Sequence, residues 1–156
     1  MGSLEDYMNT RMVRRDSKAS VLEVAKAMVD WNISSVAITD DEESKKVVGI
    51  LTERDIVKSI AKGVPPDGIT AGSLMSSPIL SIRNDQPIEE AALLMIRNKV
   101  RHLLVEDPAR QRVIGIITTT DLARYLKQRM KETTAAREDE KEQSSELLAE
   151  VWELYF

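Results

Sequence analysis

The chain has 156 residues, of which 42% are hydrophobic and only 4% aromatic, so we expect one domain or two small subdomains with an aliphatic core. It has no cysteine and a single histidine, His102, which excludes disulfides, thiolate metal sites and a metal cage of several histidines. The formal net charge is −4, but the acidic excess lies in residues 131–156, so the body lacks the clustered basic charge of a nucleic-acid surface and no nucleic-acid partner is expected.

The sequence gives no sign of a membrane or secretory segment. No apolar run approaches the roughly 18 residues that a membrane span needs, and no signal peptide is visible. The start of the chain, MGSLED, has Asp6 where a myristoylation signal needs Ser or Thr. We therefore expect a cytoplasmic protein.

Two segments of the chain repeat one another. Residues 8–28 align with residues 75–95 at an offset of 67. The octet GILTERDI, residues 49–56, aligns with GIITTTDL, residues 115–122, at an offset of 66. The offset changes because the loop after Asp40 is one residue longer than its counterpart, and surface loops tolerate such changes. The chain is therefore a tandem repeat with a tail.

The first repeat predicts five elements in chain order. Residues 12–15 are expected to be extended. A helix then opens at the capping residue Ser20, and its apolar residues follow i, i+3, i+4, i+7 spacing: Val21, Val24, Ala25 and Met28. Residues 36–39 and 47–51 predict a hairpin across a polar loop. A second helix is expected over residues 53–62.

The second repeat predicts the same order. An extended segment at residues 79–83 precedes a helix that starts at Pro87, and its apolar residues have the same spacing: Ile88, Ala91, Ala92 and Met95. Residues 103–106 and 113–117 predict the hairpin, and residues 119–131 the second helix.

These elements predict an α+β fold of two tandem β-α-β-β-α repeats with a C-terminal helical tail. The expected boundaries are 5–62 for repeat 1, 63–72 for a linker rich in Gly and Pro, 73–130 for repeat 2 and 131–156 for the tail. One repeat alone buries too little surface. We therefore expect the two repeats to share a core about a pseudo-twofold axis, with two clefts related by that axis.

The tail is polar first and apolar later. Its apolar residues lie on one face of a predicted helix that Ser144 or Ser145 would cap: Leu147, Leu148, Val151, Trp152 and Tyr155. Such a face needs a groove, on the chain's own body, on a partner subunit or on another protein, so residues 144–156 are a candidate partner-binding segment. The alternative is a frayed chain end.

Thr and Asp recur three residues apart in both octets, as Thr52 and Asp55 and as Thr118 and Asp121. Each pair stands where a strand meets a helix. This is the spacing of a capping box with Asp in place of Glu, which needs no ligand. The same junction also suits a ligand, because a helix N-terminus attracts phosphate and a carboxylate accepts hydrogen bonds from a ribose.

Within the two repeats the sequence resembles the cystathionine-β-synthase (CBS) domain. The resemblance is carried by VRHLLVED, GIITTTD and the lead-in MSSPILSI in repeat 2, and by YMNTRMV, ISSVAITD and GILTERD in repeat 1. It covers about residues 5–128. The family implies a module whose clefts bind adenosine compounds: AMP, ADP, ATP or S-adenosylmethionine.

The resemblance also assigns candidate ligand residues. Phosphate and ribose would be held by Thr52, Asp55, Thr118, Thr120 and Asp121. Adenine would lie against apolar residues of the first strand and of the octet strand: Met12, Val13, Ile79, Leu80, Ile50 and Ile116.

The two repeats differ in charge at these positions. Repeat 2 has Arg101 and His102 where repeat 1 has two serines, and this pair is similar to the phosphate-binding pair in the nucleotide-sensing subunit of AMP-activated kinase. It would serve either cleft, or else Arg101 is a solvated charge and His102 packs at an interface. Arg54 would add phosphate charge or simply cover surface.

The resemblance implies a regulatory or energy-sensing homodimer that binds an adenine nucleotide reversibly, with no tightly bound cofactor and no metal. The alternative is an interaction scaffold with empty clefts and a partner-binding C-terminal helix. We do not expect an enzyme, because the sequence offers neither a nucleophile with its base nor a phosphate loop ending in Gly-Lys-Ser/Thr.

Overall fold

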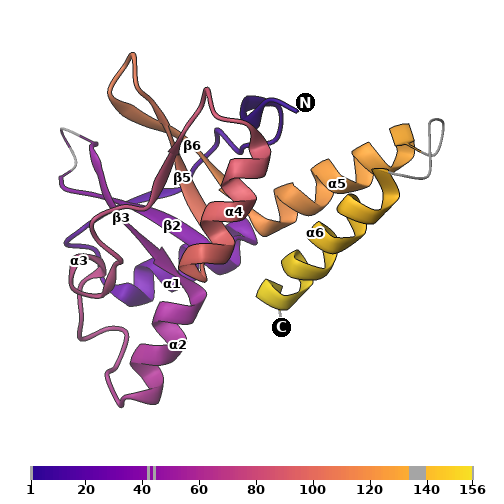
Figure 1. Ribbon diagram of the computed structural model, residues 1–156. Coiled ribbons are helices and arrows are strands. Elements are labelled where there is room, and N and C mark those ends of the chain that lie inside the picture. Colours follow the sequence, from indigo (N-terminus) through magenta and orange to yellow (C-terminus); the bar gives the residue numbers. More distant parts are fainter. Residues whose placement is uncertain (1, 42, 44, 134–139, 156) are drawn as a thin grey trace. The chain divides into compact units, whose positions relative to one another are not determined.

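The computed structural model of the chain describes residues 2–41, 43, 45–133 and 140–155 (Figure 1). The chain forms two compact units. The repeat-1 unit is Arg11–Leu80, and the repeat-2 unit is Met1–Thr10 together with Ser81–Phe156. The N-terminal segment thus belongs to the unit that contains the second repeat.

The repeat-1 unit has a three-stranded sheet in the order β1-β2-β3, with β1 parallel to β2 and β2 antiparallel to β3. Its elements are β1 (Arg14–Asp16), α1 (Val21–Trp31), β2 (Ser35–Thr39), β3 (Val47–Thr52), α2 (Glu53–Ala61) and the short α3 (Ala71–Leu74). The β-α-β-β-α order predicted for the repeat is confirmed, and α3 is an addition.

The repeat-2 unit repeats this sheet as β4-β5-β6. Its elements are the 3-10 helix η1 (Leu4–Asp6), β4 (Ser81–Arg83), α4 (Ile88–Asn98), β5 (His102–Asp107), β6 (Arg112–Thr118), α5 (Thr119–Thr133) and α6 (Glu140–Tyr155). The predicted α+β class and the C-terminal helix are therefore confirmed. None of the described helices is long and apolar enough to cross a bilayer.

Aliphatic side chains fill the repeat-1 core, as the scarcity of aromatic residues predicts. The α1 residues Val21, Val24 and Met28 form one buried cluster with residues of the sheet and α2. Ser20 caps α1 through a complete capping box with Glu23, in which the Glu23 amide donates to Ser20 Oγ over 3.2 Å. Both predictions for α1 are therefore confirmed: Ser20 caps its start, and its apolar stripe is buried.

Irregular backbone positions recur in matching pairs. Asn32 and Lys99 both end the first helix of a repeat in the left-handed conformation, with φ of 49° and 53°. Lys45 and Gln111 have φ of 50° and 49° in the two hairpin loops. Because non-glycine residues avoid positive φ, these pairs show that the duplication extends to the details of the backbone.

The linker packs on its own repeat. In the first turn of α1, the Val21 amide donates to the Ile69 carbonyl over 3.0 Å and the Leu22 amide donates to the Pro66 carbonyl over 2.9 Å. The Ala71 amide donates to the Ala19 carbonyl over 2.7 Å. The segment therefore satisfies helix-end amides that a helix leaves unpaired.

The N-terminal segment packs on the repeat-2 unit. Leu4 in η1 is fully buried, and it is equivalent to the fully buried Ala71 in α3. The hydroxyl of Tyr7 donates to Gln128 Oε1 over 2.8 Å, and the rings of Tyr7 and Tyr125 meet edge to face at 5.2 Å. The segment before β1 thus belongs to the repeat-2 unit, and the segment before β4 belongs to the repeat-1 unit.

The C-terminal helix α6 packs along α5 and against α4 (Figure 1). Val151 is buried, whereas Trp152 is exposed. The helix starts at Glu140, so the prediction that Ser144 or Ser145 caps it is wrong, because strong helix formers precede the serines. The side chains of Leu147 and Tyr155 lie outside the described part.

Candidate functional site

The Thr-Asp junction of repeat 1 is a complete capping box. The Thr52 amide and hydroxyl both donate to Asp55 Oδ2, over 2.9 and 2.8 Å. The Asp55 amide lies 3.4 Å from Thr52 Oγ1, to which it donates. Thr52 thus ends β3 and caps α2 in one residue, and both side chains are half-buried.

Repeat 2 reproduces this geometry. The Thr118 amide and hydroxyl donate to Asp121 Oδ2 over 2.9 and 2.7 Å, and the Asp121 amide donates to Thr118 Oγ1 over 3.4 Å. Asp121 is buried. Both octets therefore form helix caps in the structure. A ligand site is still compatible with these caps, because a phosphate would bind at the same helix N-terminus.

The first backbone amide of α2 and that of α5 make equivalent hydrogen bonds. The Glu53 amide donates to the Ser34 carbonyl over 3.0 Å, and the Thr119 amide donates to the Arg101 carbonyl over 3.1 Å. This bond ties the residue before the middle strand to the start of the second helix. It places Arg101 beside the repeat-2 junction and Ser34 beside the repeat-1 junction.

The octet glycines are required by a close backbone approach. A Cβ on Gly49 would lie 2.3 Å from Met75 Sδ, and a Cβ on Gly115 would lie 2.9 Å from Met8 Sδ. The next octet residues, Ile50 and Ile116, form isolated bridges with Ser76 and Asn9. A lead-in segment therefore crosses each octet strand one residue after its glycine.

Two of the predicted apolar residues, Val13 and Ile50, are joined through the sheet of the repeat-1 unit. The Val13 carbonyl accepts from the Ala37 amide over 3.1 Å, and Ala37 pairs with Ile50 across the sheet. Met12 belongs to the same unit, and so do Ile79 and Leu80, which the sequence had assigned to repeat 2; all three are half-buried. The structure thus joins Val13 and Ile50 through one strand, while Arg54 is exposed on α2.

The predicted residues of repeat 2 gather at its junction. His102 pairs with Thr118 in the sheet register and is buried, and Arg101 precedes it. Ile116 is buried on β6. Thr120 is exposed on the first turn of α5. The structure therefore places Arg101, His102, Thr118 and Asp121 in one neighbourhood of one unit.

One contact of the repeat-2 junction was not predicted. The Arg124 guanidinium lies 3.2 Å from Asp121 Oδ1. The sequence signal was a basic residue one turn after the Asp, on the same helix face. Lys58 is equivalent to Arg124, but the structure shows no ion pair between Lys58 and Asp55 among the described residues.

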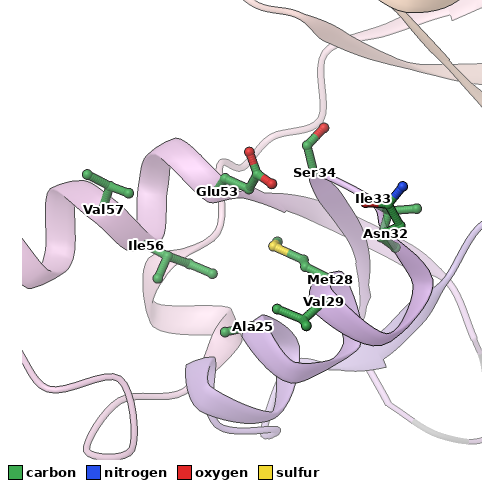
Figure 2. Close-up of a pocket in the computed structure, with 9 residues that line it drawn as sticks. All are labelled: Ala25, Met28, Val29, Asn32, Ile33, Ser34, Glu53, Ile56 and Val57. Atoms are coloured by element: carbon green, nitrogen blue, oxygen red, sulfur yellow. The ribbon is translucent and has the colours of Figure 1, made fainter.

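A groove of about 690 Å³ opens between α1 and α2, beside the repeat-1 junction (Figure 2). Its lining is mainly apolar: Ala25, Met28, Val29, Asn32, Ile33, Ser34, Glu53, Ile56 and Val57. Neither Thr52 nor Asp55 lines it. Within the described ranges, no cluster of three or more His, Cys, Asp or Glu side chains is arranged to hold a metal ion.

The family model of the CBS domain matches residues 4–62 and 71–128. The chain belongs to the CBS-domain family. The two matched CBS repeats begin at Leu4 and Ala71, the equivalent buried residues of η1 and α3.

Curated relatives have related sequences. Uncharacterized protein MK0525 of Methanopyrus kandleri is 34% identical over 104 residues, 66% of this chain. Hypoxic response protein 1 of Mycobacterium tuberculosis is 31% identical over 127 residues, 81% of this chain and 86% of the relative. The chain spans only 52% of MK0525 and 23% of L-aspartate semialdehyde sulfurtransferase of Methanocaldococcus jannaschii, so CBS repeats of this kind also occur within longer proteins.

Solved structures of CBS domain pairs have the same fold. The CBS domain pair of protein MJ0100, in complex with 5-methylthioadenosine and S-adenosyl-L-methionine, has a TM-score of 0.73 at 27% identity, and the match covers 83% of this chain and 98% of that one. CBS domain protein PAE2072 from Pyrobaculum aerophilum, complexed with AMP, has a TM-score of 0.71 at 25% identity, with 78% and 90% covered.

Proposed function

We propose that this protein is a regulatory CBS-pair module that binds an adenosine compound reversibly: AMP, ADP, ATP or S-adenosylmethionine. The observation that carries the proposal is the duplicated strand-to-helix junction, in which Thr and Asp have the same hydrogen bonds in both CBS repeats. Similar CBS pairs are complexed with AMP or with S-adenosyl-L-methionine, which supports this ligand class.

The ribose would be held by the junction aspartates. Each uses Oδ2 for its own cap. Among the described residues, Oδ1 of Asp55 makes no hydrogen bond or ion pair, whereas Oδ1 of Asp121 lies 3.2 Å from the Arg124 guanidinium. A carboxylate oxygen accepts up to two hydrogen bonds, so Asp55 is the better placed of the two to bind a ribose diol without rearrangement.

The phosphate would favour the repeat-2 junction. Arg101 and Arg124 lie there with Asp121, whereas Glu53 and Asp55 accompany Arg54 and Lys58 in repeat 1. The net charge of these residues is therefore +1 at the repeat-2 junction and 0 at the repeat-1 junction. Thr120 lies at the N-terminus of α5, where the helix dipole also attracts an anion. The Thr118 hydroxyl would bind phosphate only by giving up its cap hydrogen bond to Asp121. His102 is buried beside this group and would position it.

The adenine would lie against aliphatic surface. In repeat 1 this surface is Met12, Val13 and Ile50, and in repeat 2 it is Ile79, Leu80 and Ile116, of which Ile79 and Leu80 belong to the repeat-1 unit of the structure. Because a ligand shifts a conformational equilibrium only by its differential affinity for the two states, regulation requires that the compound bind one arrangement of the module more tightly. We place this role in a cytoplasmic homodimer without a catalytic step.

Calorimetric titration with AMP, ATP and S-adenosylmethionine tests the proposal. Asp55→Asn and Asp121→Asn retain an acceptor for the cap but remove the charge. Since a hydrogen bond to a charged group contributes about 1.5–3 kcal/mol, each variant should weaken its own site about 10-fold to 150-fold. Arg101→Gln should weaken AMP and ATP while leaving S-adenosylmethionine unchanged, because only the nucleotides carry phosphate.

Glu43→Gln is the matched control, since it removes a carboxylate in the loop between β2 and β3, which is part of neither junction. No heat and no thermal shift of the wild type with any of the three compounds would refute nucleotide binding. Turnover of a nucleotide by pure protein would refute the regulatory assignment.

The second candidate function is an interaction scaffold with empty clefts. Two observations favour it: both capping boxes are complete without a ligand, and apolar surface is exposed on α1 and α2. A partner recruited by residues 144–156 would have to use the exposed side of α6, where Trp152 lies, because Val151 is already buried. Trp152→Ala would then abolish partner binding and leave nucleotide titrations unchanged.

A further inference from the structure

The carboxylate of Asp121 takes part in a helix cap and in an ion pair at the same time. Its Oδ2 accepts the two cap hydrogen bonds from Thr118, and its Oδ1 lies 3.2 Å from the Arg124 guanidinium. The side chain of Asp121 is only 9% exposed, whereas that of Arg124 is 61% exposed. An ion pair with one partner in water is weak, so Arg124 can leave Asp121 when another anion is offered.

The equivalent carboxylate of repeat 1 is not held in this way. Asp55 accepts the same two cap hydrogen bonds through Oδ2. Lys58, which is equivalent to Arg124, forms no ion pair with Asp55 among the described residues. Asp55 is also half-buried, whereas Asp121 is buried. The two junctions therefore differ at the oxygen that a ribose diol would use.

This difference at Oδ1 affects which adenosine compounds can bind. Each carboxylate oxygen accepts up to two hydrogen bonds, and Oδ2 of Asp121 already accepts two. A ribose diol that donates both hydroxyls to Asp121 therefore needs all of Oδ1, so Arg124 must move away. A phosphate offers the guanidinium a bidentate, charged partner in exchange. Adenosine offers no such partner, because it carries no anion.

The charges at the two helix N-termini also differ. The first turn of α2 holds two carboxylates, Glu53 and Asp55, whereas the first turn of α5 holds only Asp121. A carboxylate at a helix N-terminus offsets the positive end of the helix dipole. The N-terminus of α5 therefore attracts a phosphate more strongly than that of α2.

We propose that Arg124 is a specificity-determining residue of the repeat-2 junction: it occupies the ribose-binding oxygen of Asp121 and gives it up only to a ligand that carries a phosphate. This inference rests on the proposed function and names the ligand class of each junction. Repeat 2 selects adenosine phosphates. Repeat 1 accepts adenosine compounds with or without a phosphate, including S-adenosylmethionine.

Calorimetry with AMP and adenosine tests the inference, because these compounds differ only in the phosphate. The Asp55→Asn variant weakens the repeat-1 site and so isolates the repeat-2 junction. In this background, Arg124→Gln should tighten adenosine about 2-fold to 5-fold, the strength of an exposed ion pair. It should weaken AMP about 10-fold, the loss of a hydrogen bond between charged groups. The preference for AMP over adenosine should thus fall about 20-fold or more.

Arg110→Gln is the matched control. Arg110 pairs with Asp107 over 3.5 Å, also three residues apart, and the two side chains are 66% and 13% exposed. This ion pair has the same form as that of Arg124, but it lies at the loop between β5 and β6. Arg110→Gln should therefore leave the affinities for AMP and adenosine unchanged.

The reciprocal change should transfer the selectivity to repeat 1. In an Asp121→Asn background, which weakens the repeat-2 site, Lys58→Arg places a guanidinium where it can pair with Asp55. Adenosine should then bind about 2-fold to 5-fold more weakly, whereas AMP should bind at least as tightly as before. An equal loss for both compounds would contradict the proposed role of the guanidinium.

An Arg124→Gln variant that loses AMP and adenosine affinity equally, or changes neither, would overturn the inference. Equal losses would mean that Arg124 supports the helix and does not select the ligand, and thermal unfolding shows whether the variant is folded. A wild type that binds AMP with a preference that Arg124→Gln leaves unchanged refutes only this inference. A wild type that binds no adenosine compound refutes the proposed function, and the inference with it.

Discussion

The two units have the same backbone arrangement, but they differ in the helices that pack on it. Both have the same strand order, the same left-handed helix ends and the same Thr-Asp cap. The repeat-2 unit adds Arg101, His102 and a covering helix, whereas the repeat-1 unit keeps its helical face open. Duplication thus preserved the residues that hold the fold and let the residues at the junction and on the helices diverge.

The largest loss of stability should come from shortening Leu4, which the N-terminal segment contributes to the core of the repeat-2 unit. Leu4 is fully buried and its counterpart in the repeat-1 unit is only an alanine, Ala71. Leu4→Ala should lower the free energy of unfolding by about 3 kcal/mol, because it leaves a cavity. Urea unfolding measures the loss, and hydrogen exchange should place it in α4 and α5. Unchanged exchange there would show that the N-terminal segment does not support this core.

The two octet glycines should differ in their tolerance of a methyl group. Gly49→Ala brings Cβ within 2.3 Å of Met75 Sδ, and Gly115→Ala brings it only within 2.9 Å of Met8 Sδ. We expect losses of about 2 and about 1 kcal/mol, since overpacking costs this much. The order is checked by urea unfolding of both variants.

A double variant, Gly49→Ala with Met75→Ala, isolates the cause. The pair should lose less than the sum of the single losses, because the colliding side chain is gone. Additive losses would contradict the steric explanation and point to the backbone of Ser76, whose carbonyl lies 3.0 Å from the added Cβ.

The repeat-2 unit should be destabilised at alkaline pH through Tyr125. Burial, followed by its hydrogen bond to Glu89, raises the pKa of Tyr125 above the ordinary 10.0. A raised pKa in the folded state means that stability is present below the unfolded pKa and is lost as pH rises through the folded pKa. The equivalent residues of the repeat-1 unit, Leu22 and Ser59, have no such pair.

Unfolding of the wild type should therefore become easier as pH rises above the ordinary tyrosine pKa of about 10. Tyr125→Phe should remove that part of the pH dependence, although it leaves Glu89 without its donor. A wild-type curve that stays parallel to the Tyr125→Phe curve over this range would contradict the assignment.

The helix ends should show the smallest effect. Lys99 adopts a φ of 53° without the side-chain advantages that Asn32 has at the equivalent position. Lys99→Gly should stabilise the chain by about 0.5–1 kcal/mol, and Asn32→Lys should destabilise it by a similar amount. Thermal unfolding of the two variants measures both signs, and stabilisation by Asn32→Lys would refute the argument.

Local patterns were sufficient for the elements and for the centre of each junction. Helix spacing, the Ser20 cap and the β-branched hairpins predicted the β-α-β-β-α order, because each depends on residues close in sequence. The octets predicted the Thr-Asp hydrogen bonds for the same reason. The start of α6 was missed because the predicted serine caps lie within a run of helix-forming residues.

The sequence by itself determined that this protein is built from two like units, since a repeated pattern of buried positions needs no knowledge of distant contacts. Only the tertiary structure decided which segments complete each unit. Tyr7 and Met8 contact α5 and β6 more than a hundred residues later in the chain, and α6 packs on the helices of one unit only. Such choices depend on the fit between surfaces far apart in sequence, and a local pattern does not record that fit.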